Sequence, residues 1–208
     1  MSDRRVRAYV GLGANLGDPS ATLALAVTAL AGLPGMRVRG VSRLYATKPV
    51  GVEDQPEFRN AVVALDVLAD PDRASSALSL LSALKALERA FGRRRRRRWG
   101  ARELDLDLLV FGRARLAIER PEEGRSLDAE HNSAVAAKLL IVPHQAAAER
   151  LFVLAPLADL APGLVPPGWG QSVETARRRQ LAREGADAAR PVGSWDAGSA
   201  RWRPIQPR

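Results

Sequence analysis

The chain of 208 residues contains no cysteine, so disulfide bonds and thiolate metal sites are excluded. Lysine is scarce: it occurs only as Lys48, Lys85 and Lys138, and the other 29 of the 32 basic residues are arginines. Aromatic residues make up only 5%, and no apolar run is long enough to cross a bilayer. We therefore expect one compact domain with a C-terminal tail, in a reducing, cytoplasmic environment.

Basic residues outnumber acidic ones, and the formal net charge is +9. A surplus of this size favours an anionic partner, and a nucleotide, a polynucleotide and a membrane surface all satisfy it. Net charge alone does not choose among them.

Hydrophobic periodicity predicts two helices and four strands in the order β-α-β-β-α-β. The predicted elements are a strand at 6–12, a helix starting at Asp18-Pro19, strands at 36–46 and 58–65, a helix starting at Asp70-Pro71-Asp72 and ending at Gly92, and a strand at 103–111. We interpret the glycines of GLGANLGD as turn formers after the first strand. The order is that of the ferredoxin-like α+β sandwich, an antiparallel sheet with helices packed on it.

The remainder of the chain has a weaker pattern. Residues 113–139 lack a clear period and are expected to form a long loop or insertion. The catalytic or binding domain should extend over 1–167, and 168–208 should form a partly irregular C-terminal addition with one helix.

Asp105 and Asp107 are two positions apart in the predicted strand ELDLDLLVF. Alternate residues of a strand share a face, so both carboxylates project together, opposite Leu104, Leu106 and Leu108. Two oxygen donors on a rigid element suit Mg²⁺ when waters and phosphate oxygens complete its coordination. A solvated acidic strand face is the alternative that spacing alone leaves open.

Six arginines, Arg93 to Arg98, stand just before this strand, followed by Arg102. Such a run is by itself typical of a solvated or nucleic-acid-binding loop. A polyphosphate bound with its metal needs both signs of charge in one place, however. The combination favours a phosphoryl-transfer site.

Five motifs together resemble the 6-hydroxymethyl-7,8-dihydropterin pyrophosphokinase family and cover about residues 8–162 in order. They are AYVGLGANLGD, SRLYATKPVGVEDQPEFRNAVVAL, FGRRRRRRWG, RWGARELDLDLL and VPHQAAAERLFVLAPLADLAP. The resemblance implies transfer of the pyrophosphoryl group of ATP to the hydroxymethyl oxygen of the pterin, with release of AMP, in folate biosynthesis. Departures from the family pattern occur at Ala101, Lys85 and Gln145.

The resemblance also implies roles for individual residues. Two Mg²⁺ ions would be held by Asp105 and Asp107, and the catalytic residues would be Arg93, Arg95 and Asp107. Contacts with ATP would come from Glu88, Arg95, Arg98, Arg102, His144 and Arg150. The pterin would be bound by Thr47, Val50, Gly51, Phe58, Asn60, Trp99 and Phe152, with Phe58 and Phe152 stacking on its two faces.

Two other functions share parts of this pattern. The RNA-recognition fold has the same element order, but it stacks bases on aromatic residues of its central strands, where this chain places ELDLDLL. A regulatory ferredoxin-like domain that binds a small molecule without turnover is the second alternative. We expect a monomer that acts on pterin and ATP, without nucleic-acid or membrane partners.

Overall fold

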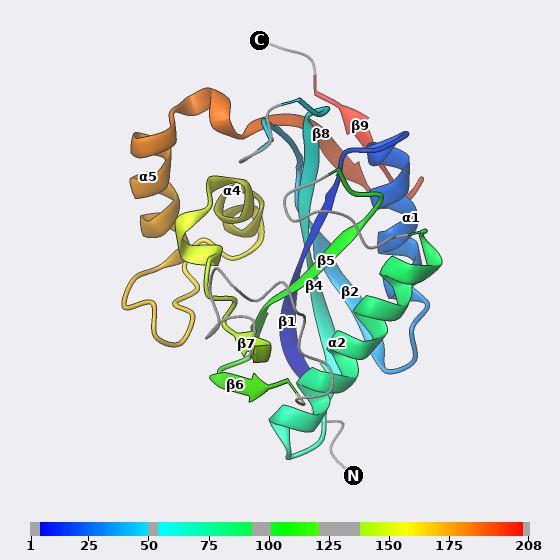
Figure 1. Cartoon of the computed structure of the whole chain (residues 1–208), viewed down its shortest axis with the longest axis vertical. Coiled ribbons are helices and arrows are strands. Elements are labelled where there is room, and N and C mark those ends of the chain that lie inside the picture. Colours follow the sequence, from blue (N-terminus) through cyan, green and yellow to red (C-terminus); the bar gives the residue numbers. More distant parts are fainter. Residues whose placement is uncertain (1–4, 50–53, 93–100, 121–137, 206–208) are drawn as a thin grey trace.

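The computed structural model describes residues 5–49, 54–92, 101–120 and 138–205 (Figure 1). The first part of the chain forms β1 (Arg5–Ala14), α1 (Pro19–Ala31), β2 (Met36–Val41), β3 (Leu44–Thr47), β4 (Phe58–Leu68), α2 (Arg73–Ala90) and β5 (Asp105–Phe111). The second part forms β6 (Leu116–Glu119), β7 (Lys138–Val142), η3 (Ala147–Glu149), α4 (Leu151–Leu160), α5 (Val173–Glu184), η4 (Ala186–Ala188), β8 (Arg190–Asp196) and β9 (Arg201–Pro204).

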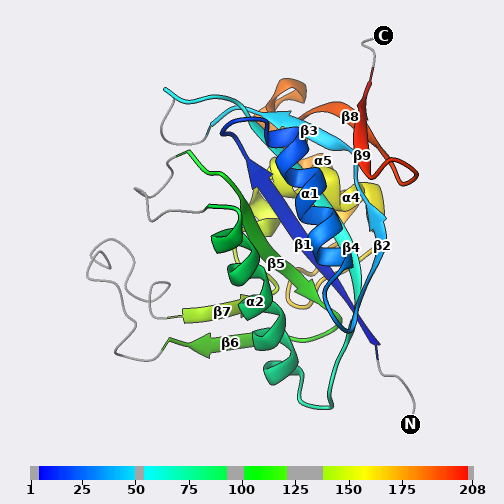
Figure 2. The ribbon, with the colours of Figure 1, turned by 90° about the vertical axis from the view of Figure 1, so that its right-hand side faces the viewer.

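The main sheet is antiparallel and runs in the order β5-β1-β4-β3-β8-β9, with β2 beside β4 (Figure 2). Its centre, β5-β1-β4 flanked by β2 and β3, has the strand arrangement of the predicted ferredoxin-like sandwich. The fold prediction is thus confirmed, and the C-terminal addition extends the sheet by two strands. None of the helices in the described ranges has the length and apolar character that a membrane crossing requires.

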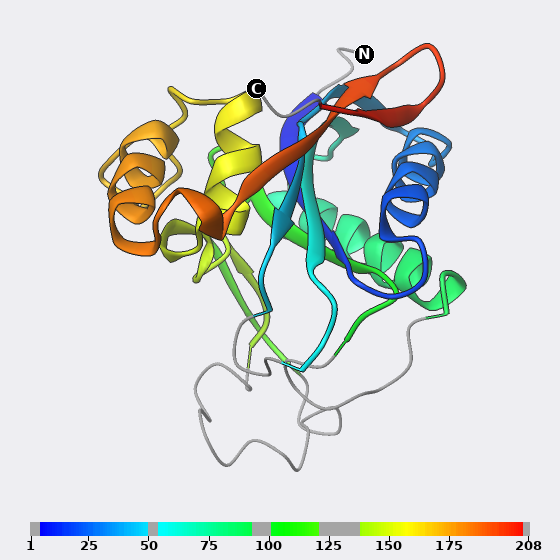
Figure 3. The same ribbon diagram turned by 90° about the horizontal axis from the view of Figure 1, so that it is seen from above.

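Helices cover both faces of the sheet (Figure 3). α1 and α2 pack on one face, where Val10, Leu12 and Leu65 belong to the larger apolar core. α4 and α5 cover the other face, where Val62 of β4 and Leu154 of α4 belong to a second core. Alternation along the strands divides these residues between the two cores, since successive side chains point to opposite faces.

The two predicted helix starts are confirmed. Asp18 caps α1, its carboxylate accepting a hydrogen bond from the Ala21 amide at 3.0 Å, and Pro19 occupies the first helical position. Asp72 caps α2 in the same way through the amide of Ala74 at 2.9 Å.

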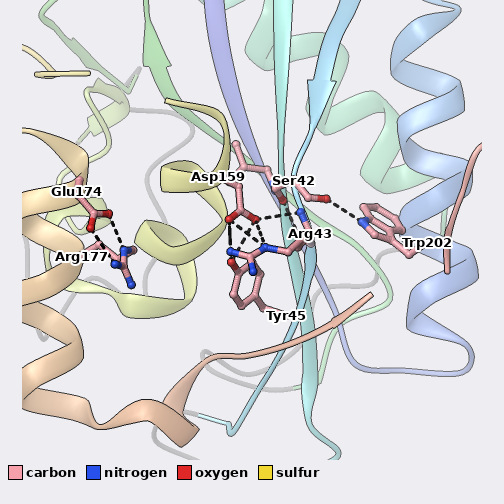
Figure 4. A network of polar contacts seen from close by, with 8 residues as sticks. Ser42, Arg43, Tyr45, Asp159, Glu174, Arg177 and Trp202 are labelled. Carbon is pink, nitrogen blue, oxygen red and sulfur yellow. Dashed lines mark hydrogen bonds and ion pairs between the residues drawn. The ribbon is translucent and has the colours of Figure 1, made fainter. Parts of the chain in front are cut away.

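The predicted strand at 36–46 is divided into β2 and β3 by Ser42 and Arg43 (Figure 4). Side chains bind the backbone at the break: Ser42 Oγ accepts the Val62 amide at 2.9 Å, and Asp159 accepts the Arg43 amide at 3.0 Å. Trp202 Nε1 donates to the Ser42 carbonyl at 2.9 Å. Asp159 and Trp202 are more than a hundred residues away in sequence, so the local alternating pattern gives no sign of the break that they contact.

The prediction that the glycines of GLGANLGD form turns is wrong for two of them. Gly11 and Gly13 lie within β1, which continues to Ala14. Only Gly17 has the positive φ of a turn glycine, at 62°. The two strand glycines instead remove side chains from one face of the sheet.

Two segments predicted to be irregular contain regular structure. β6 lies inside 113–139 and pairs with β7 in a separate two-stranded sheet. In the C-terminal addition, α5 forms where a helix was predicted, and β8 and β9 join the main sheet through pairing with β3. Arginine, alanine and glycine dominate this segment. Trp195 and Trp202 supply apolar surface, and their rings contact edge to face with centroids 4.7 Å apart.

We expect substitution of Trp202 by alanine to lower the free energy of unfolding by about 3 kcal/mol, because it removes a buried aromatic ring and the donor to Ser42. Arg201→Ala, at an exposed neighbouring position of β9, should cost less than about 0.5 kcal/mol. Denaturant unfolding of both variants measures the difference. Equal, small effects would mean that β9 is not part of the cooperative fold.

Candidate active site

A cleft lies where β1 and β3 end and β4 and β5 begin, and the start of α4 also lines it. It is lined by Gly13, Thr47, Lys48, Phe58, Asn60, Arg102, Asp105, Asp107, Arg150 and Phe152. The structure therefore brings the predicted metal ligands together with the predicted pterin-binding residues. Asp105 and Asp107 are not turned apart, and both face the cleft that Phe58 and Asn60 line.

The floor of the cleft is set by the register of three strands. Gly13 of β1 lies opposite Asn60 of β4 on one side and opposite Asp105 of β5 on the other. A Cβ atom at Gly13 would be 3.1 Å from Asn60 Oδ1, a closer approach than ordinary van der Waals contact. The missing side chain thus leaves space between the amide and the carboxylate.

Asn60 is held in one orientation by a neighbour on the adjacent strand. Its Nδ2 donates to Thr47 Oγ1 at 2.7 Å, and both residues are buried. Phe58 lies two residues earlier on the same face of β4, directly opposite Thr47 of β3. An oriented amide and an aromatic ring therefore occupy neighbouring positions, as recognition of a flat polar heterocycle requires.

The two aspartates of β5 are half-buried, while Leu106 and Leu108 between and after them are buried in the core behind the sheet. Arg102 Nη1 donates to Asp105 Oδ2 at 2.6 Å. Within the described ranges, no group of three or more histidine, cysteine or acidic residues is arranged to hold a metal. Two carboxylates fit Mg²⁺, which keeps several waters and takes phosphate oxygens from a substrate.

Asn15 holds the backbone of Arg102, the residue whose side chain binds Asp105, although the sequence did not indicate this role. Its side-chain Oδ1 accepts a hydrogen bond from the Arg102 backbone amide at 2.7 Å. Its backbone amide donates to the Arg102 carbonyl at 3.0 Å. Its Nδ2 donates to Gln55 Oε1 and the Pro56 carbonyl. This buried asparagine joins the segments before β4 and before β5, and its place right after the glycines of β1 was the available signal. Lys48, which also lines the cleft, was missed as well.

His144 lies just after β7, and its amide donates to the Leu109 carbonyl of β5 at 2.9 Å. Burial lowers the pKa of its imidazole, and the nearby Asp107 and Asp105 carboxylates oppose that shift. Its Nδ1 is buried and, within the described part of the chain, lacks a hydrogen-bond partner. A neutral imidazole with an unsatisfied nitrogen beside the two aspartates is suited to contact a bound ligand.

Arg150 and Phe152 enter the cleft from the first turn of α4. The Arg150 guanidinium carbon is 5.7 Å from the centroid of the Phe152 ring. Phe152 and Phe58 thus come from a helix and a strand, respectively, and line the same cleft. The stacking of these two rings on a pterin stays a prediction.

Glu88 is placed differently from the other residues predicted to bind nucleotide. It is buried on α2 and does not line the cleft. Its Oε1 accepts the Leu106 amide at 2.7 Å and Lys85 Nζ at 2.7 Å, while Lys85 also donates to the Leu106 carbonyl at 3.0 Å. The pair satisfies backbone groups at the outer edge of β5, directly behind the two aspartates.

Six predicted site residues lie outside the described residues. They are Val50, Gly51, Arg93, Arg95, Arg98 and Trp99.

The sequence profile of 7,8-dihydro-6-hydroxymethylpterin-pyrophosphokinase (HPPK) matches residues 9–162. A Methylorubrum extorquens protein named 2-amino-4-hydroxy-6-hydroxymethyldihydropteridine pyrophosphokinase is 42% identical over 162 residues, covering 78% of this chain and 87% of that protein. A Pseudomonas aeruginosa protein with the same name is 43% identical over 161 residues, covering 77% and 84%.

The fold is similar to that of solved structures as well. The wild-type Plasmodium falciparum HPPK-DHPS structure with pteroate superposes with a TM-score of 0.69 at 13% identity, covering 99% of this chain. The chain spans about half of that longer protein, 48% of its length. At this identity the likeness shows the fold, while the profile and the curated relatives carry the assignment: the chain belongs to the 7,8-dihydro-6-hydroxymethylpterin-pyrophosphokinase family.

Proposed function

We propose that this protein is a diphosphotransferase that moves the pyrophosphoryl group of ATP to the hydroxymethyl oxygen of 6-hydroxymethyl-7,8-dihydropterin. AMP is released, and the product serves folate biosynthesis. The observation that carries the proposal is the single cleft in which Asp105 and Asp107 lie beside Phe58 and Asn60, in a chain of this family. Both halves of such a reaction, a polyphosphate with its metal and a flat acceptor, find suitable groups there.

At the acidic end, Asp105 and Asp107 would hold Mg²⁺, and we propose two ions. Bound metal would neutralise phosphate charge and polarise the bridging oxygens. Arg102 binds Asp105 and faces the same cleft, so its guanidinium is positioned to contact phosphate as well. Asp107 is assigned a second role, accepting a hydrogen bond from the hydroxymethyl group as it attacks.

At the aromatic end, the pterin would lie between the rings of Phe58 and Phe152. Asn60, oriented by Thr47, would pair with the polar edge of the heterocycle. Main-chain groups of Val50 and Gly51 would bind the same polar edge of the pterin. Trp99 would cover the bound substrate.

The nucleotide would extend from the aspartates toward α4. Arg150 lines the cleft, and the backbone amide of His144 binds the carbonyl of Leu109, two residues after Asp107 on β5, so we assign both residues to ATP. We assign Arg93, Arg95 and Arg98 to the phosphates, whose negative charge their guanidinium groups would neutralise. Glu88 keeps its assignment to ATP, although its carboxylate also binds the edge of β5.

The RNA-binding alternative has no support from the site. On β1 and β5 the cleft face presents Gly11, Gly13, Asp105 and Asp107, and Phe58 of β4 is the one aromatic residue that a strand contributes to the cleft lining in the described part of the chain. An RNA-recognition surface instead stacks successive bases on several aromatic rings of its central strands. We further propose that the enzyme works as a monomer in the cytoplasm, which size-exclusion chromatography and cell fractionation test directly.

Substitution of Asp107 by alanine should reduce AMP formation from ATP, Mg²⁺ and the hydroxymethyl pterin by at least about a thousandfold, because it removes a metal ligand from the reacting centre. Asp66→Asn is the matched control, since Asp66 is a half-buried carboxylate near the far end of β4, away from the cleft, and pairs with Arg7 at 2.7 Å. Its rate should stay within about twofold of the unmodified enzyme.

Omission of the pterin gives the background of that assay. Retention of RNA without AMP formation by the unmodified protein would overturn the proposed function in favour of the RNA-binding alternative.

Phe152→Ala should raise the KM for the pterin about 10- to 100-fold, because a stacked ring is worth about 1–3 kcal/mol. The KM for ATP should change much less, since Arg150 remains in place. Steady-state kinetics with each substrate varied in turn measure both constants. Equal changes in the two KM values would contradict the assignment of Phe152 to the pterin site.

A further inference from the structure

α4 carries two residues of the cleft on a helix that is weak by itself. It has only ten residues and contains Pro156, which cannot donate a backbone hydrogen bond. Its N-cap residue, Arg150, provides no side-chain cap. The first amides of a helix need external acceptors, so the start of α4 depends on other parts of the chain.

α5 supplies one such acceptor. Oε1 of Glu184, the last residue of α5, accepts the Leu151 amide of α4 at 3.2 Å. Gln180, one turn earlier, donates to the same oxygen at 2.6 Å. A carboxylate at a helix N-terminus stabilises it through both the hydrogen bond and the helix dipole.

The capped amide lies between two residues of the cleft wall. Leu151 is itself buried, and its neighbours in sequence are Arg150 and Phe152, which both line the cleft. Glu184 does not line the cleft. Any effect of Glu184 on a bound ligand must therefore pass through the position of the first turn of α4.

The opposite wall is in contact with the same C-terminal segment. β8 pairs with β3, where Ala46 lies opposite Arg190, next to Thr47 of the cleft. Arg190 Nη2 also donates to Glu57 Oε1 at 2.8 Å, and Glu57 precedes Phe58. Residues 184–190 thus reach the chain beside each of the two phenylalanines, one on α4 and one on β4.

We infer that residues 184–190 position the two aromatic walls of the cleft relative to one another, with Glu184 and Arg190 as positioning residues for the acceptor substrate. The inference rests on the proposed function for the identity of that substrate. This segment lies beyond residues 9–162, which match the family profile. It contributes through Leu151 and Glu57, not by touching the reacting atoms.

The test compares two glutamates of α5 in the full-length protein. Glu184→Ala should raise the KM for the pterin about two- to fivefold at saturating ATP with kcat nearly unchanged, because loss of a helix cap is a modest effect. Glu174→Ala is the matched control: it removes the same charge from the same helix, where Glu174 pairs with Arg177 and Arg178. The pterin KM of the control should not change.

Two further variants separate positioning from loss of folding. Glu184→Gln retains an acceptor oxygen and should restore most of the pterin affinity. Arg190→Ala acts on the other wall and should also raise the pterin KM, by about twofold, as expected for an exposed ion pair. Equal pterin KM values in Glu184→Ala and Glu174→Ala would overturn the inference.

Hydrogen exchange gives a readout that does not need catalysis. Amides of α4 should exchange faster in Glu184→Ala than in Glu174→Ala, while those of β1 and β4 stay equally protected. If the unmodified protein forms no AMP, the proposed function fails, and the exchange experiment still reports on the cap. Unchanged exchange in α4 would overturn the positioning role even in an active enzyme.

Discussion

The pairing of β1 with both β4 and β5 is the constraint on which the cleft depends. It places Gly13 between Asn60 and Asp105, so that an amide and a carboxylate from distant parts of the chain share one face with a gap between them. A slip of one residue would turn the aspartates into the core behind the sheet and bring Leu106 into the cleft. The apolar cores on both faces prevent such a slip, since each strand has buried residues on either side.

The same register separates dry and polar regions of the sheet. The middle of β4 is buried on both faces, whereas the strand ends carry the side chains that face the cleft. Asn15, Thr47 and Glu88 are buried polar groups around this region, and each is hydrogen-bonded to a backbone or side-chain partner. Satisfied buried groups hold neighbouring segments in one arrangement, which a site assembled from several strand ends requires.

Local patterns predicted much of the fold and of the site, because they depend on neighbours in sequence. Alternation placed Asp105 and Asp107 together, and the Asp-Pro signal located the start of α1. Features with distant causes were not predictable in this way. Trp202 binds Ser42 at the break between β2 and β3, and Glu184 caps the Leu151 amide, and neither contact leaves a local periodicity in the sequence. The C-terminal segment is rich in arginine and has few apolar residues, so its sequence pattern does not indicate that its strands extend the sheet.

The charge arrangement explains why the cleft is suited to a substrate that brings its own metal. Asp105 already binds Arg102, so one acidic group of the cleft is partly neutralised without a ligand. Lys48 and Arg150 add positive charge to the same lining. A polyphosphate would place negative charge among these cations, and its magnesium would place positive charge between the aspartates. Each half of the site therefore needs the other: carboxylates alone would repel the phosphates, and cations alone would not bind the magnesium that accompanies them.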